Sequence, residues 1–152
     1  MKNRFLYRVV LVLSLSLIVS CSTSEDDSTN NTVEIQQLES TAETGTWRVT
    51  NLVDSGRDET SDFNGYVFSF LENGTVTATN GTTIYDGTWS VTRDDDDDND
   101  VEFNIFFPVP DSNDFDDLND DWDIVSYSDT IINLIDISGG NGDTDMLTFE
   151  KN

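Results

Sequence analysis

Carboxylate side chains dominate the chemistry available to this sequence. The 152 residues include 31 Asp and Glu against seven Lys and Arg, no histidine, and one cysteine, Cys21. Without histidine, the Ser-His and Cys-His nucleophiles and His-ligated zinc sites cannot be assembled from these residues. A glycosidase needs two carboxyl groups at a set separation, one with a raised pKa, and no spacing isolates such a pair. We therefore expect a protein that is not an enzyme.

An acidic run between two predicted strands could bind calcium, because carboxylate oxygens are ligands that hard cations prefer. The weak candidate ligands are Asp94, Asp96, Asp98 and Asp100. The ordered EF-hand spacing fails, since the sixth position counted from Asp94 is Asn99 rather than Gly and the twelfth is Ile105 rather than Glu. Such a run is more often a solvated loop. We expect no cofactor beyond weak calcium binding.

The first residues have the pattern of an export signal. Lys2, Arg4 and Arg8 precede an apolar run from Val9 to Val19. That order is typical of a secretory signal peptide, and the run is too short for a full membrane span. We expect residues 1–20 to be removed.

The apolar run ends in Ile18-Val19-Ser20-Cys21, which resembles the lipobox of bacterial lipoproteins. The resemblance implies a lipid on Cys21 and cleavage directly before it, with Ile18, Val19 and Ser20 as the cleavage motif. The alternative is a plain signal peptide with an incidental cysteine. With the lipid, the protein is expected to be held at a membrane through Cys21, where several acyl chains together make stable anchoring.

Residues 21–44 are expected to form a disordered polar tether, because the tract from Ser22 to Thr32 has no apolar side chain to bury. Val33 to Thr44 could form a short helix. Glu25-Asp26-Asp27 resembles the export signal of lipoproteins displayed on the outer face of the bacterial outer membrane, although a solvated spacer is the alternative reading. We expect a lipid-anchored, surface-exposed outer-membrane protein.

The charge excludes some partners. Cleavage before Cys21 leaves four basic against 31 acidic residues, a formal charge of −27. Phosphate backbones repel such a chain, and no basic stripe remains, so nucleic acid is excluded. The single cysteine leaves no disulfide in this sequence, and we expect a monomer.

Residues 45–152 read as all-β, with runs of alternating apolar and polar residues between turn signals. Asn73-Gly74 and Asn80-Gly81 predict hairpins whose two central residues both have positive φ. Asp86-Gly87 is either a turn or a bend within one long strand, of which we favour the bend. Asp114 to Leu118 predicts a short helical turn. The resulting fold is an eight-stranded antiparallel up-and-down meander, which avoids exposed edges by closing into a β-barrel.

Two Gly-x-Trp segments, Gly45-Thr46-Trp47 and Gly87-Thr88-Trp89, precede a third tryptophan, Trp122, and a closing segment, Leu147 to Lys151. In this order they resemble the lipocalin-like domain of bacterial surface lipoproteins. The resemblance implies a lipocalin-like barrel with Trp47 closing one end and an arginine on the last strand against it, a place for which this chain offers only Lys151. The motif residues with an expected structural role are Gly45, Trp47, Gly87, Trp89 and Trp122.

Two functions follow from this barrel. The first is a binding protein that takes a small apolar or amphipathic ligand into an open barrel mouth. The second is a structural or interaction module with a side-chain-filled barrel, whose acidic loops contact a protein or a polysaccharide. Aromatic residues at strand spacing are more often core than pocket, which favours a filled or nearly filled interior. The ligand-contacting residues are not defined by the sequence.

Overall fold

The computed structural model describes residues 27–93, 101–137 and 144–152. In these ranges the strands form where apolar and polar residues alternate, as expected. The helices are α1 (Asp27–Glu43) and the short 3-10 helices η1 (Thr60–Phe63) and η2 (Asp114–Leu118). The strands are β1 (Trp47–Asp54), β2 (Arg57–Asp58), β3 (Val67–Phe70), β4 (Thr75–Thr79), β5 (Ile84–Arg93), β6 (Val101–Phe106), β7 (Asp120–Ser128), β8 (Ile131–Ile137) and β9 (Thr144–Lys151).

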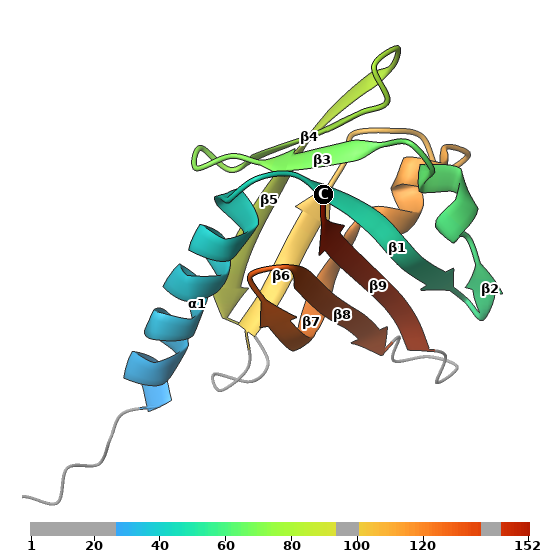
Figure 1. The fold of residues 1–152 in the computed structure, drawn as a ribbon. Coiled ribbons are helices and arrows are strands. Elements are labelled where there is room, and N and C mark those ends of the chain that lie inside the picture. Colours follow the sequence, from blue (N-terminus) through green and yellow to red (C-terminus); the bar gives the residue numbers. More distant parts are fainter. Residues whose placement is uncertain (1–26, 94–100, 138–143) are drawn as a thin grey trace, which may run out of the picture.

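Every strand pairs antiparallel to its neighbours, and the sheet closes on itself (Figure 1). The sheet order is β2-β1-β3-β4-β5-β6-β7-β8-β9, and the additional β1–β9 ladder runs from Trp47↔Lys151 to Val53↔Met146. The two-residue β2 only extends the hairpin after β1, so eight strands form the closed barrel. The expected eight-stranded antiparallel barrel and the helical turn at Asp114–Leu118 are confirmed.

The barrel interior is occupied by aromatic side chains. Phe70 lies edge-to-face on Phe103 and Phe149, with ring centroids 5.3 and 5.4 Å apart. Phe68 contacts Phe149 at 5.3 Å and Phe107 at 6.5 Å. All five rings are at most 1% exposed. An eight-stranded barrel is just wide enough for its side chains to fill, and these rings from β3, β6, β9 and the residue after β6 do so.

The β3–β4 and β4–β5 hairpins lie where the two Asn-Gly pairs predict them, but their conformation differs. Only the glycines have positive φ, +78° at Gly74 and +84° at Gly81; neither asparagine does. In the first hairpin the Gly74 amide donates to the Leu71 carbonyl and the Leu71 amide to the Thr75 carbonyl. This is a three-residue loop with a type I turn followed by one left-handed residue. The expectation of positive φ at both residues was wrong because these loops are longer than two residues.

Gly87 lies within the continuous strand β5, which confirms the bend rather than a turn. A Cβ atom built on Gly87 would lie 2.3 Å from the carbonyl oxygen of Phe106 and 2.9 Å from the Phe107 ring. Glycine is needed here because the backbones of β5 and β6 approach too closely for any side chain.

The structure differs from the expected tether at residues 27–32, because the short helix considered for Val33 to Thr44 extends back over them: α1 covers 17 residues. Leu38 and Ala42, four residues apart and therefore on one helix face, are fully buried. Helices in proteins gain most of their stability from such tertiary packing rather than from local propensity. The polar composition of the segment concealed this face.

The two ends of the barrel differ in what covers them. We call the end with α1, the start of β1 and the end of β9 the helix end, and the end with β2, η1 and η2 the acidic end. In Figure 1, α1 lies on the left and the two 3-10 helices lie on the right. Gly45, with φ +83°, turns the chain from α1 into β1. Within the described ranges, no helix has the length and apolarity needed to cross a membrane.

Candidate functional site

The three tryptophans of the expected motif fix backbone segments at the barrel ends. The Trp47 indole N–H donates to the Ala42 carbonyl in the last turn of α1, at 2.8 Å. The Trp89 indole donates to the Leu71 carbonyl in the β3–β4 loop, at 2.9 Å, and the Trp122 indole to the Leu118 carbonyl of η2, at 3.1 Å. Each is nearly or fully buried. The motif residues therefore have the geometry of structural residues.

Lys151 occupies the place that the family resemblance assigns to an arginine. Its Nζ lies 4.9 Å from the centroid of the Trp47 ring, a cation–π arrangement. Beside it, the Arg48 Nη2 donates to the Glu150 Oε2 at 2.7 Å across the β1–β9 ladder. The strands that close the barrel are thus joined by side chains as well as by the backbone.

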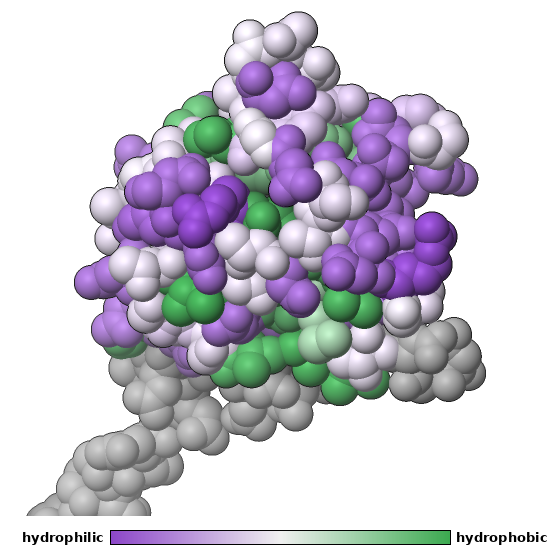
Figure 2. All heavy atoms as spheres, turned by 45° about the vertical axis from the view of Figure 1, so that its right-hand side comes forward, coloured by the Kyte–Doolittle hydropathy of each residue, from purple (hydrophilic) through white to green (hydrophobic). Residues whose placement is uncertain are grey.

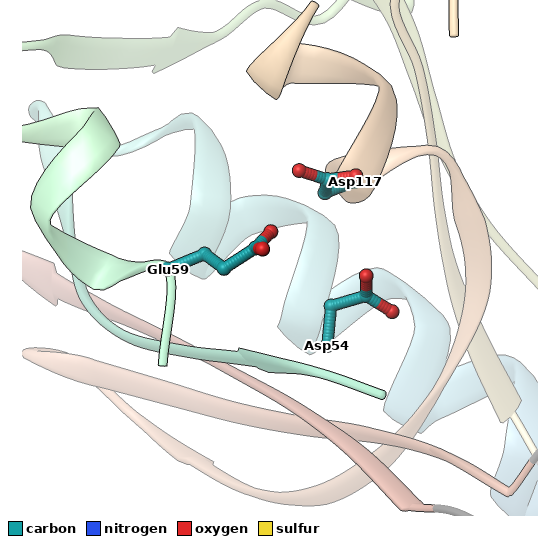
Figure 3. Close-up of side chains that lie close together, drawn as sticks. All are labelled: Asp54, Glu59 and Asp117. Carbon is teal, nitrogen blue, oxygen red and sulfur yellow. The ribbon is translucent and has the colours of Figure 1, made fainter. Parts of the chain in front are cut away.

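Three carboxyl groups meet at the acidic end (Figure 3). Asp54 ends β1, Glu59 precedes η1, and Asp117 belongs to η2; one oxygen from each lies within 4.8 Å of the others. All three side chains are half-buried. The positive charge beside them is Arg57, whose Nη1 lies 3.3 Å from Glu59 Oε1. We call these three residues the acidic trio.

The environment of the acidic trio favours protonation. The pKa of Asp117 is raised from 3.8 to about 7, first by burial and then by a hydrogen bond with Glu59 and the charges of Glu59 and Asp54. The pKa of Asp54 is also raised, by burial and by the charge of Asp145. Like charges this close disfavour full ionisation. The trio can therefore share a proton near neutral pH, and its oxygens are of the kind that hard cations prefer.

A groove lies on the outer surface of β5, β6 and β7, where η2 forms one wall. Its volume is about 690 Å³, within the range of small-ligand sites. Thr88 pairs with Phe106, and Ser90 pairs with Asn104, which pairs in turn with Asp121. The side chains at these alternate strand positions point away from the core, and they line the floor of the groove. Its lining is completed by Trp89, Ile105, Asp116, Asn119 and Asp120.

Asn119 fixes the wall of the groove. Its Oδ1 accepts from the Phe107 amide at 2.6 Å, and its Nδ2 donates to the Phe107 carbonyl and to Asp116 Oδ1, both at 3.0 Å. The pKa of Asp120 is raised to about 6, first by burial and then by the charge of Asp136. Phe106 is 55% exposed, although it lies in a strand. The groove therefore combines a rigid wall, an exposed aromatic ring and several hydrogen-bonding groups.

Two further depressions over the described residues are also open to solvent. One lies at the β3–β4 loop, lined by Leu71, Glu72 and Asn73. The other lies between α1 and Tyr127, whose hydroxyl is 3.4 Å from Gln37 Oε1. The acidic trio lines none of these three depressions, so no substrate-sized cavity faces it among them.

Several predicted site residues lie outside the described residues. These are the cleavage motif Ile18, Val19 and Ser20, the lipid attachment residue Cys21, and the calcium candidates Asp94, Asp96, Asp98 and Asp100. Lipid attachment and calcium binding at these positions stay predictions. The acidic trio and the groove were not predicted, because each joins segments that are remote in sequence and meet only in the folded chain: β1, η1 and η2 for the trio, and β5, β6, β7 and η2 for the groove.

Comparison with known proteins yields structural likeness but no sequence match. No family model and no curated protein matches the sequence. Among solved structures, the chain is similar to the 1.00 Å crystal structure of a DUF4847 family protein from Bacteroides vulgatus. The two share 18% sequence identity with a TM-score of 0.49, over 76% of this chain and 97% of the other. That protein is described by its family alone.

Proposed function

We propose that this chain is a lipid-anchored, surface-displayed and non-enzymatic interaction module of the lipocalin-like type. Its barrel is filled by side chains, and its outer face contacts a protein or a polysaccharide partner. The filled interior is the observation that carries this proposal. It favours the second of the two functions considered from sequence over the first, because Phe68, Phe70, Phe103 and Phe149 occupy the space that an apolar ligand would need.

The character of the outer surface supports an interaction role. Figure 2 shows hydrophilic residues over most of the face turned forward from the side of β2, η1 and η2, with hydrophobic patches lower on that face. The described depressions open outward. A polar surface with a groove suits a water-soluble partner at the cell surface better than a lipid-like ligand.

A titration with the apolar fluorophore N-phenyl-1-naphthylamine tests the filled interior. The mature chain, residues 21–152, with Cys21→Ala lacks both the acyl chains and the apolar export segment that would compete for the fluorophore, and it is expected to give no saturable fluorescence increase. A matched variant, Phe70→Ala, creates space inside the barrel and is the positive control for fluorophore entry. Saturable one-to-one binding by the Cys21→Ala protein, displaced by a fatty acid, would establish an open mouth and overturn the proposal.

Fractionation of the native host tests the anchor. The wild-type protein is expected in the outer-membrane fraction with a mass that includes lipid on Cys21. The Cys21→Ala protein is expected in the soluble periplasmic fraction, because the charge of the chain offers no other attraction to anionic headgroups. A control, Ser22→Ala, leaves the cysteine intact and is expected to stay with the membrane. Recovery of Cys21→Ala in the membrane fraction would refute lipid anchoring at this residue.

A further inference from the structure

The groove on β5, β6 and β7 has the chemistry of a sugar-binding surface. Exposed aromatic rings in strands are unusual, since aromatic side chains gain most when buried. Phe106 nevertheless lies 55% exposed, directly opposite Thr88 in the β5–β6 ladder. The neighbouring row, Ser90, Asn104 and Asp121, presents a hydroxyl, an amide and a carboxylate on the same side of the sheet.

These groups match the two kinds of surface on a neutral sugar. The hydroxyls of a sugar both donate and accept hydrogen bonds, and the groove offers carboxylate acceptors together with hydroxyl and amide groups that can do both. The C–H face of a pyranose ring is apolar and flat, and an exposed aromatic ring is a flat apolar surface on which it can lie. Asn119, held by three hydrogen bonds, keeps the groove wall in place without a ligand, which reduces the entropy lost on binding.

We propose that this groove binds a neutral oligosaccharide, with Phe106 stacking against a sugar ring and Asp121 and Ser90 hydrogen-bonding its hydroxyl groups. This inference rests on the proposed interaction function and names the partner class. The chain's charge of −24 argues against acidic polysaccharides, which the three groove aspartates would repel. A basic peptide is the competing partner class. It would meet carboxylates over the whole acidic chain, whereas this groove places a ring that is 55% exposed among hydroxyl and amide groups.

The test is binding of the full chain with Cys21→Ala to an array of defined neutral oligosaccharides, including β-glucan, xylan, mannan and chitin fragments, with tetralysine as the basic probe. Titration calorimetry with the best-binding oligosaccharide then gives its Kd. Saturable binding of at least one neutral oligosaccharide is expected, and binding to none of them would overturn the inference.

Variants locate the bound sugar. Phe106→Ala is expected to weaken binding by tenfold or more, Phe106→Tyr to retain it, and Asp121→Asn to weaken it several-fold. Ile84→Ala is the matched control, because Ile84 is a 65% exposed apolar residue that does not line the groove. Circular dichroism verifies that each variant is folded.

Two further results would overturn the inference. One is equal affinity in Phe106→Ala and Ile84→Ala, which would place the sugar elsewhere. The other is tighter binding of tetralysine than of every sugar, with loss on Phe106→Ala, which would assign the groove to a basic peptide. Neither result bears on whether the barrel is filled, so failure of this inference and failure of the proposed function are distinguishable.

Discussion

The helix end and the acidic end of the barrel have opposite effects on the stability of the fold at neutral pH. At the helix end, Leu38, Ala42 and Trp47 are fully buried, and the Trp47 indole satisfies a carbonyl in the last turn of α1. At the acidic end, the three carboxyl groups of the acidic trio lie close together, and the ion pair beside them joins Glu59 to the largely exposed Arg57. Burial and hydrogen bonding favour folding at any ordinary pH, whereas crowded carboxylates oppose it once they ionise. The helix end therefore stabilises the folded state, whereas the acidic end destabilises it at neutral pH.

Removal of the Trp47 indole should cause the largest change in the free energy of unfolding at the helix end. Trp47→Ala deletes a fully buried side chain, and we expect a loss of about 3–5 kcal/mol in the free energy of unfolding. Trp47→Phe keeps most of the apolar contact but leaves the Ala42 carbonyl without its donor, for an expected loss of about 1–3 kcal/mol. Urea denaturation of the full chain with Cys21→Ala measures both. A smaller loss of unfolding free energy in Trp47→Ala than in Trp47→Phe would contradict this account.

Truncation in α1 tests whether the helix is a packed part of the fold. Leu38→Ala is expected to lower the free energy of unfolding by about 2–3 kcal/mol, because Leu38 is fully buried against the barrel. Amide hydrogen exchange should then become faster in residues 38–43 than in β9. Gln36→Ala, an exposed position on the same helix, is the control and should change stability by less than about 0.5 kcal/mol. Equal exchange in wild type and Leu38→Ala would show that the helix does not depend on this contact.

The acidic end should make the protein more stable at pH 5 than at pH 8. The folded Asp117 keeps its proton up to a pKa of about 7, whereas the unfolded chain releases it near 3.8. The folded state therefore holds more protons between these values, and stability falls as pH rises through this window. Asp117→Asn should reduce the difference in Tm between pH 5 and pH 8 and raise the Tm at pH 8.

A charge-matched control separates the trio from the net charge. Asp111→Asn removes the same single charge at an exposed position and should leave most of the pH dependence in place. The raised pKa values of Asp54 and Asp120 act in the same direction, so some dependence should also survive in Asp117→Asn. Identical profiles of Tm against pH for Asp117→Asn and Asp111→Asn would show that the net charge of the chain, rather than the acidic trio, causes the fall in stability with rising pH.

The cation–π contact at the helix end should give the smallest effect. Lys151→Met keeps an unbranched apolar stem but removes the charge above the Trp47 ring, and we expect a loss of about 0.5–1 kcal/mol. Lys151→Arg retains a cation and should be close to wild type. Thermal unfolding of the two variants side by side measures the difference. Equal stabilities of the Lys151→Met and Lys151→Arg variants would show that the charge above the Trp47 ring contributes nothing to the stability of the fold.

The strands were the most predictable part of the fold. In β6, Val101, Phe103 and Ile105 alternate with polar residues, and the buried positions follow that alternation. Gly87 was correctly placed in a bend because Asp-Gly stood inside one continuous pattern. The helix α1 was underestimated, since Leu38 and Ala42 are a weak signal among polar residues and acquire meaning only when a barrel surface is there to cover them.

The groove and the acidic trio could not be predicted in the same way. Asp54 and Glu59 are close in the chain, but Asp117 is remote from both, and nothing in their local sequence distinguishes the three from the other acidic residues. The outward position of Phe106, by contrast, follows from the alternation that places it with Glu102 and Asn104. The groove beside it was hidden, because β7 and η2 reach it only in the folded chain.

The sequence by itself determined the strand pattern, the closure of a meander into a barrel, the excess of negative charge and the absence of histidine chemistry. These properties depend on residue type and local spacing, which do not change on folding. Only the tertiary structure decided which carboxylates meet, how the inward aromatic rings pack on one another and where a groove forms. Those features depend on distances between residues that are remote in sequence, and the register and closure of the sheet set these distances.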